Sequence, residues 1–381
     1  MSPLVLAAGC MGILCGQVLT GAIPEDREMT EFRELKKGVD RIDYQGAPVS
    51  TTGWNKVSEA EWPFFSLVYL GYAACHLVES KPERKAGLAP EIQTLIGRLQ
   101  SDRISGFVRP HFGAPFDPAE KRVSVLFHGH YLRLLLQYRR VTGDVQFDGQ
   151  IQDLAGRFVR SFAEDELGIL PSYPGMWWPT DNLPALAALR DYDRQFGMDL
   201  AAVPCRKWVA GMQKYFVDPS TGLICGYIDP VARKPVSPPR GVGIMFAFPF
   251  LKQVDPVWAA AQYGLAKRHL VRQFMGFYAV REFPDGVKGG ADVDSGELVM
   301  GFGPAASGFG IGAAAAMGDR ELRDRLVFSK DAVVLSAGLL PGKTGEEILP
   351  DVGRIVLFYG ETVPVASLSS PGDIDLLKRA R

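Results

Sequence analysis

The stretch WPFFSLVYLGYAACHLVE, from Trp62 to Glu79, has the pattern of a long helix. Within it, Phe65, Tyr69, Tyr72 and His76 are spaced four, three and four residues apart. This spacing places the four side chains on one face of the helix. Such a stripe usually faces a hydrophobic core, and the alternative is that it lines a cavity.

A second, amphipathic helix is predicted at Pro90 to Arg103, so the two stretches form a helix pair. Further helices are predicted at Phe127 to Val141, Gln150 to Glu164, Pro184 to Phe196, Ala201 to Phe216, Gly243 to Val254, Pro256 to Phe274 and Arg320 to Leu335. Short strands are predicted at Leu223 to Ile228 and within Ile348 to Val365. Pairs recur at intervals of roughly 45 to 60 residues without a residue-level repeat, which favours helical hairpins closed into a toroid. We therefore predict an all-α fold, an α/α barrel with a few short β-strands in its loops.

The composition is that of a globular protein. Apolar residues make up 47%, charged residues 22%, and the net charge is −1. Lysine and arginine are dispersed, which argues against a nucleic-acid partner. The five cysteines form no Cys-x-x-Cys pair, so neither a disulfide scaffold nor a structural zinc site is indicated.

The N-terminal segment, residues 1–24, differs from the rest. Met1 to Ile23 contains no charged residue and is long enough to cross a bilayer, for which about 20 residues are needed. We expect membrane association through this segment, on an undetermined side; a buried N-terminal helix is the alternative. The catalytic-type barrel domain is assigned to residues 40–381.

One loop combines aromatic side chains with a single acid. It reads SYPGMWWPTDN from Ser172 to Asn182 and leads directly into a predicted helix. Desolvation against the two tryptophans would raise the pKa of Asp181 towards the range of a general acid. The competing interpretation is that Asp181 only caps the helix that follows. Candidate substrate-binding residues in the loop are Tyr173, Met176, Trp177 and Trp178, and Ser172 could bind a substrate hydroxyl.

Other candidates lie on helices and in the glycine-rich passage from Phe283 to Gly312. His130 is a candidate partner for Asp181, and Tyr69 and Tyr72 are candidate wall residues, although a core role is an alternative for each. Asp292 and Asp294 place two carboxylates on one side of an extended segment, as a second catalytic acid or as a structural turn.

Two segments resemble cofactor-binding motifs, but neither has the full pattern. The segment after Asp292 lacks the glutamate and glycine spacing of a calcium loop, and Gly301 to Ala306 follows no convincing strand, unlike a dinucleotide fingerprint. The sequence predicts neither a metal nor an organic cofactor.

Three features in this order resemble the linalool dehydratase/isomerase family. They are His128-Gly129-His130 opening a helix that ends at Val141-Thr142-Gly143-Asp144, the Trp-Pro-x-Asp-Asn loop, and Asp292-Val293-Asp294-Ser295-Gly296 followed by Gly301 to Gly312. The resemblance implies an α/α barrel, a ring of subunits, and a cofactor-independent reaction that dehydrates and isomerises a terpene alcohol.

Carried over by position, His130 matches the family's histidine, while Ser172 and Asp181 stand where its founding enzyme has two catalytic cysteines. The loss of both thiols puts the specific terpene reaction in question. An acid and a tyrosine contributed across a subunit boundary would be sought at Asp40, Asp43 and Tyr44.

Three hypotheses follow. The first is an acid/base lyase or isomerase acting on a small apolar alcohol, with Asp181 as the principal acid. The second is a glycoside hydrolase in which Asp181 pairs with Asp292 or Asp294 and the tryptophans stack on sugar. The third is a membrane-tethered binding protein without catalysis, in which Asp181 merely caps its helix.

Overall fold

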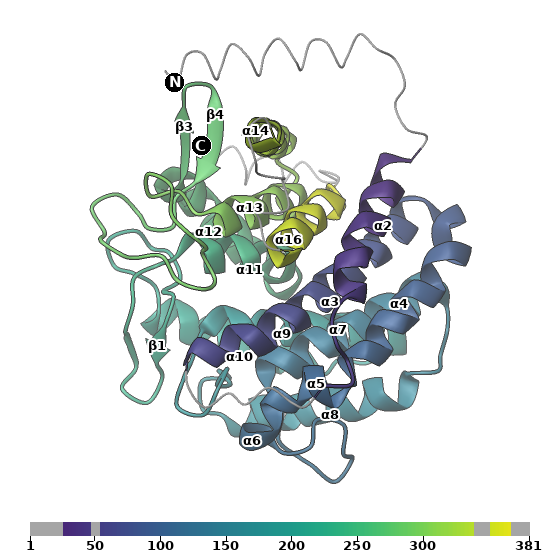
Figure 1. Cartoon of the computed structure of the whole chain (residues 1–381). Helices are drawn as coiled ribbons and strands as arrows, with labels where there is room; N and C mark the ends of the chain where they lie inside the picture. Colours follow the sequence, from purple (N-terminus) through teal and green to yellow (C-terminus); the bar gives the residue numbers. More distant parts are fainter. Residues whose placement is uncertain (1–25, 47–53, 339–350, 367–381) are drawn as a thin grey trace.

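The computed structural model describes residues 26–46, 54–338 and 351–366 (Figure 1). Helices dominate these ranges. Long ones alternate between an inner and an outer layer, and short helical turns join them. The short turns are η1 (Pro82–Arg84), α5 (Asp102–Ser105), η2 (Gly106–Val108), α6 (Arg109–Phe112) and η3 (Pro179–Asn182).

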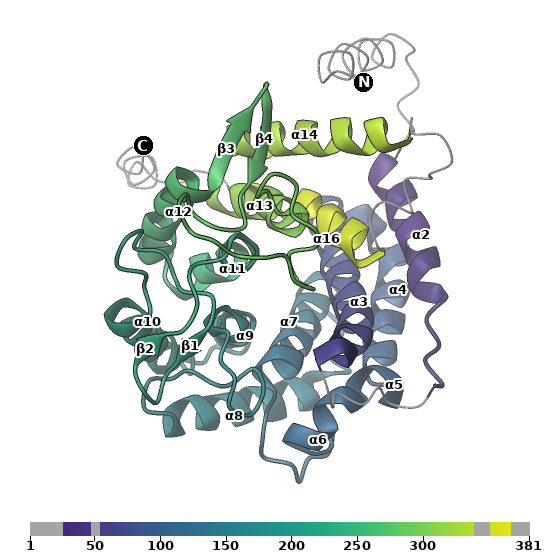
Figure 2. The ribbon, with the colours of Figure 1, turned by 60° about the vertical axis from the view of Figure 1, so that its left-hand side comes forward.

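The inner layer is a closed ring, visible in Figure 2. Its helices are α3 (Trp54–Ser80), α7 (Val125–Thr142), α9 (Leu183–Phe196), α11 (Gly241–Val254), α13 (Pro304–Met317) and α16 (Asp351–Thr362). Each packs on the next in this order, and α16 packs back on α3. The ring encloses much of the aromatic core.

A second layer of helices surrounds this ring. The outer helices are α4 (Lys85–Leu99), α8 (Asp148–Glu164), α10 (Ala202–Tyr215), α12 (Pro256–Leu270), α14 (Arg320–Gly338) and α2 (Arg27–Asp40). Most pack on the inner helix that precedes them, whereas α2 packs on both α3 and α16 and so covers the seam between them. The predicted α/α barrel is confirmed.

Helix boundaries follow from local chemistry. Helix α7 begins after Ser124, whose hydroxyl accepts a hydrogen bond from the Phe127 amide at 3.1 Å, and ends at Gly143 in the left-handed conformation. Helix α12 begins after Asp255, which caps the Trp258 amide at 2.9 Å, and Pro256 occupies its first turn. Side-chain caps and a C-terminal glycine are the usual signals for such ends.

Glycines allow α13 and α16 to approach closely. A Cβ added at Gly360 would lie 2.7 Å from the Gly308 carbonyl oxygen, and one added at Gly312 would lie 3.3 Å from the Gly360 Cα. Any side chain at Gly360 would therefore push the two inner helices apart.

Two small antiparallel hairpins lie outside the ring. The first pairs β1 (Ile228–Asp229) with β2 (Lys234–Pro235), and the second pairs β3 (Val271–Phe274) with β4 (Phe277–Val280). Among the predictions that were wrong, two concern these hairpins. The strand expected at Leu223 to Ile228 shrinks to its last residue, and the helix expected to reach Phe274 ends at Leu270 because the next residues pair with β4.

The third error is α16, which was predicted to contain a strand. Its β-prone residues Ile355, Val356, Phe358 and Tyr359 are buried, and packing against α3 and α13 decides the helical conformation. Within the described ranges, no helix has the length and apolarity needed to cross a bilayer. The segment Met1 to Ile23, to which membrane association was assigned, lies outside these ranges.

Candidate active site

The loop from Ser172 to Asn182 is a tight, well-anchored turn. The Ser172 amide donates to the Met176 carbonyl at 2.9 Å, the Met176 amide donates to the Tyr173 carbonyl at 2.8 Å, and Gly175 has a φ of 78°. The buried Asn182 side chain accepts from the Leu170 amide at 2.8 Å and donates to the Leu170 carbonyl at 3.0 Å. Both ends of the loop are thereby held at the entrance to α9.

Asp181 does not cap α9. It lies in η3, the N-cap position of α9 is occupied by Asn182, and no side chain caps the helix there. Burial is the main cause of the raised pKa of Asp181, which is about 7, with repulsion from Asp294 acting in the same direction and the nearby Ser172 hydroxyl acting against it. A carboxyl group with this pKa is partly protonated at neutral pH and can act as an acid.

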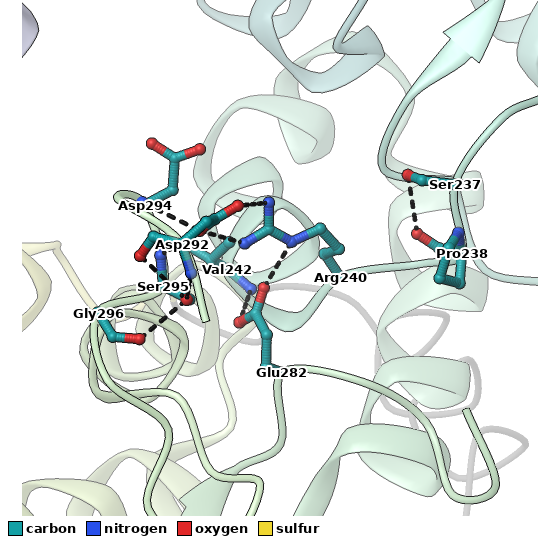
Figure 3. Close-up of polar contacts among 9 residues, drawn as sticks. All are labelled: Ser237, Pro238, Arg240, Val242, Glu282, Asp292, Asp294, Ser295 and Gly296. Atoms are coloured by element: carbon teal, nitrogen blue, oxygen red, sulfur yellow. Dashed lines mark hydrogen bonds and ion pairs between the residues drawn. The ribbon is translucent and has the colours of Figure 1, made fainter. Parts of the chain in front are cut away.

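Asp292 and Asp294 have different environments, as Figure 3 shows. Asp292 forms a two-pronged ion pair with Arg240, one prong measuring 2.7 Å between Nη2 and Oδ1, and it also accepts from the Ser295 amide at 3.0 Å. Arg240 in turn bonds the fully buried Glu282 at 2.8 Å. Asp292 is therefore committed to a structural network, which includes the N-terminus of α11 through the Val242 amide.

The Asp294 carboxyl group points away from this network. Its side chain is exposed, and desolvation by the surrounding protein, together with repulsion from Asp292, raises its pKa to about 6. Repulsion from Asp294 also raises the pKa of Asp181, so the two carboxyl groups are close enough to influence one another electrostatically.

Glu61 is a third acid of this site, and the sequence analysis missed it. It is buried on α3 and accepts a hydrogen bond from the Tyr173 hydroxyl. Burial and repulsion from Asp294 and Asp181 raise its pKa to about 8. The signal was available, because extending the helical stripe of Phe65, Tyr69 and Tyr72 back by one turn leads to position 61.

Tyr69 and Tyr72 lie on the same face of α3 as Glu61, and the Tyr72 hydroxyl is 3.0 Å from Nδ1 of His130. His130 is enclosed by aromatic rings, with centroid distances of 5.6 Å to Phe65 and 5.9 Å to Tyr69. Burial lowers the pKa of His130 to about 3, so its imidazole is neutral near pH 7. A neutral imidazole can orient a hydroxyl group but holds no proton to spare as an acid.

His128 has a structural role. Its Nδ1 accepts from the Ser124 amide at 3.0 Å and its Nε2 is 2.9 Å from the Pro115 carbonyl, so both ring nitrogens are satisfied. The N-terminal candidates also have partners within the chain. Asp40 pairs with Lys36 at 2.8 Å and with Arg98 at 2.5 Å, and the Tyr44 hydroxyl donates to the Val39 carbonyl.

An aromatic groove adjoins the acids. Its volume is about 430 Å³, and it is lined by Met176, Trp178, Tyr227, Ser237, Arg240, Phe283, Gly290 and Asp292. The Trp178 and Tyr227 rings lie 5.1 Å apart between centroids. Trp177, by contrast, pairs through its backbone with Ile228 at 3.1 Å and is partly buried beside it. Of the loop's predicted substrate-binding residues, Met176 and Trp178 thus line the groove, while Tyr173 holds Glu61.

The candidate site is rich in acids. Three carboxyl groups with raised pKa values come from α3, η3 and the loop after β4, and the Tyr173 hydroxyl is bonded to one of them, Glu61. Among the described residues, no group of three or more histidine, cysteine or acidic side chains is arranged to hold a metal ion.

Comparisons with known proteins agree with this picture at the level of family and fold. A family model described as linalool dehydratase/isomerase matches residues 101–334. No curated protein matches the chain.

Among solved structures, an unsaturated glucuronyl hydrolase specific for heparin has a TM-score of 0.53 and 12% identity, over 88% of this chain and 94% of its own. An inactive variant of the alpha-1,6-mannanase from Salegentibacter sp. HEL1_6, in complex with alpha-1,6-mannotetrose, has a TM-score of 0.55 and 10% identity, over 88% and 99%. At these identities the likeness concerns the barrel fold alone.

Proposed function

Because the chain belongs to the linalool dehydratase/isomerase family, we propose that it is a cofactor-independent acid/base enzyme that dehydrates or isomerises a small, uncharged, largely apolar alcohol. The observation that carries this proposal is a pair of carboxyl groups with raised pKa values, about 7 for Asp181 and about 6 for Asp294, of which Asp294 raises the pKa of Asp181 by repulsion. At neutral pH such a pair holds one proton to give and one carboxylate to receive a proton.

In the dehydration, the Asp181 carboxyl group gives its proton to the substrate hydroxyl, and the carbon–oxygen bond breaks to release water. The Asp294 carboxylate then removes a proton from the adjacent carbon, so that an alkene forms. Transfer of this proton to Asp181 restores the starting state, and the net change is alcohol to alkene plus water. Carboxylates and aromatic rings stabilise the positive charge that develops on carbon. Isomerisation follows when water returns at the other end of an allylic cation.

Charge restricts the substrate. Asp294 has a pKa of about 6, so at neutral pH it is largely ionised and its carboxylate repels a negatively charged substrate. The cation Arg240 is already bonded to Glu282 and Asp292. A free alcohol therefore suits the site better than a phosphate ester or a carboxylate.

The test is incubation of the purified chain with tertiary and allylic alcohols, with alkenes and isomeric alcohols measured by gas chromatography. Asp181→Asn should lower the rate by about 10²- to 10⁴-fold, since general acid catalysis contributes that much. Its melting temperature should stay close to that of the parent, because Asp181 caps no helix. Full activity in Asp181→Asn would refute the assignment.

Restoring the family's thiols gives a second readout. The double variant Ser172→Cys, Asp181→Cys places cysteines where the founding enzyme of the family has them. We expect this double variant to dehydrate a terpene alcohol if the rest of the site is compatible with that reaction. The single variant Ser172→Cys is the matched control, because it leaves Asp181 in place.

Glycoside hydrolysis is the second candidate function, and the aromatic groove beside the carboxyl groups favours it. Trp178 and Tyr227 could stack on a sugar ring while Asp181 and Asp294 serve as the carboxylate pair. Release of nitrophenol from aryl glycosides, lost in both Asp181→Asn and Asp294→Asn, would select this function. Activity on alcohols with no release from glycosides would reject it.

A further inference from the structure

The tip of the β3–β4 hairpin exposes two large apolar side chains. Phe274 is 53% exposed and Met275 is 51% exposed. Figure 2 shows the hairpin projecting beyond the barrel beside α14. A convex tip with apolar side chains contributes little to the core and lowers solubility, so its residues call for another explanation.

Turn chemistry sharpens this point. Phe274 pairs with Phe277, so the loop consists of Met275 and Gly276, with φ values of 50° and 87°. Two-residue turns of this kind favour Asn-Gly or Asp-Gly, since asparagine and aspartate tolerate the left-handed conformation. The turn conformation requires glycine at position 276. At position 275 a polar residue such as asparagine would stabilise the turn more than methionine does.

The apolar surface continues onto α14. The Phe277 ring stacks on Phe328 with centroids 6.0 Å apart and planes inclined by 13°, and Phe328 is 46% exposed. The Tyr278 amide donates to the Ser329 hydroxyl at 2.8 Å, which fastens the hairpin to the helix. We call Phe274, Met275, Phe277 and Phe328 the hairpin ridge.

The first described helix, α2, begins near the hairpin ridge. Arg27, the first residue of α2, pairs with Asp331 at 3.7 Å, and Asp331 lies about one helical turn beyond Phe328. In the sequence, α2 is preceded by residues 1–23, which contain no charged side chain. Residues 1–23 are therefore as uncharged as the ridge itself.

We propose that the hairpin ridge is a lipid-contacting face, which seats the barrel on a bilayer surface beside its apolar N-terminal stretch. Aromatic and methionine side chains on a protruding tip can insert among lipid chains. The cations around the ridge are engaged, Arg272 with Asp285 and Arg325 with Glu321. Binding should therefore depend on apolar contact and little on anionic lipid. This inference does not rest on the proposed reaction.

The test uses the full chain and vesicles of phosphatidylcholine. In flotation assays, Met275→Asn and Phe328→Ser should each lower the partition coefficient about five- to tenfold, as expected for one apolar side chain withdrawn from lipid. Met275→Asn should melt at the parent's temperature or above, because asparagine suits the turn, so a loss of binding cannot be ascribed to unfolding. The matched control is Val231→Asn, since Val231 is 84% exposed in the turn of the other hairpin.

A second measurement separates the ridge from the N-terminal stretch. The parent's tryptophan fluorescence is subtracted from that of each variant. Brominated lipids should quench the remaining fluorescence of Phe274→Trp but not that of Val231→Trp. Absence of quenching at position 274 would overturn the proposal. So would sedimentation showing that Met275→Asn dissociates an oligomer while vesicle binding is unchanged, because the ridge would then contact a second copy.

Discussion

Asp294 raises the pKa of Asp181 by repulsion, and the protonation states of these two carboxyl groups decide which proton transfers they can support. Asp181 has a pKa of about 7 and must be protonated to act as the acid, while Asp294 has a pKa of about 6 and must be ionised to act as the base. We predict a bell-shaped dependence of kcat/KM on pH, with its maximum between these values. In Asp294→Asn, the decrease of kcat/KM on the acidic side of the maximum should disappear. A rate that keeps rising above pH 8 would contradict the roles assigned to the pair.

The ionisation of Glu61 makes the stability of the folded chain depend on pH. Burial and repulsion from Asp294 and Asp181 raise its pKa from an ordinary 4.5 to about 8, so between these values the unfolded chain ionises at this position while the folded chain stays protonated. Stability from this group is complete below about pH 4.5 and is lost as pH rises towards 8. Asp181 and Asp294 act in the same direction.

Glu61→Gln removes this dependence. We predict that the difference in free energy of unfolding between Glu61→Gln and the parent changes in favour of the variant as pH rises from 5 to 8. Urea unfolding at four pH values measures it. Glu79→Gln, on the exposed end of the same helix, is the matched control and should show no such trend. Parallel curves for Glu61→Gln and the parent would show that Glu61 ionises normally in the fold.

The sequence predicted some residues of this candidate site and not others, for physical reasons. Asp181 was predicted because aromatic residues surround it in the chain itself. Glu61 was not predicted, because its partner Tyr173 is 112 positions away and only the fold brings them together. Asp292 and Asp294 are two residues apart, and only Asp292 is paired with Arg240, a difference that periodicity does not reveal.

At the scale of elements, the glycines between α13 and α16 set the width of the barrel. Gly360→Ala would place a Cβ 2.7 Å from the Gly308 carbonyl oxygen, which belongs to the backbone and can move only with its helix. We predict a loss of about 1–3 kcal/mol in free energy of unfolding, the usual result of overpacking.

Gly97→Ala is the matched control for this substitution. It also lies within a helix, α4, but an added Cβ there meets nothing within 4 Å. Helix propensity should make it neutral or stabilising by up to about 1 kcal/mol. Equal effects of the two substitutions in urea unfolding would mean that α13 and α16 are not closely packed.

Arg240 fastens the loop that carries Asp294 to the start of α11. Its Nε is 2.8 Å from the fully buried Glu282, and it also holds Asp292. Arg240→Met should cost about 3–5 kcal/mol, since it leaves the Glu282 carboxylate buried without its cation. Limited proteolysis should then cleave between residues 283 and 303. The double variant Arg240→Met, Glu282→Gln should recover part of the stability, and failure to recover any would show that the ion pair itself is not the anchor.

Element boundaries were predictable where the chain carries its own signals. Ser124 and Gly143 delimit α7, and the predicted helix differs from the observed one by at most two residues at either end. Helix α16 was mistaken for a strand because Ile355, Val356, Phe358 and Tyr359 favour strands locally. Their burial against α3 and α13 outweighs that preference. Local sequence patterns do not predict such contacts between distant segments.

For the whole molecule, helix pairing alone was enough to predict the α/α barrel. What pairing could not supply is the order of contacts that closes the ring, in which α16 packs on α3 and α2 covers the joint. The same limit applies to the aromatic groove, because Met176, Tyr227 and Phe283 come from three separate segments.

Because α16 closes the ring and is synthesised after the other inner helices, the barrel can close only late in synthesis. Synthesis delivers α3, and with it Glu61 and Tyr69, long before α16, and Tyr69 packs on Tyr359 with ring centroids 5.0 Å apart. Until residues 351–362 emerge, the wall beside Tyr69 is missing and the aromatic interior is open along one side. The nascent chain therefore holds a nearly complete set of acids in an unsealed barrel, and its interior needs protection from water and from other chains during that interval.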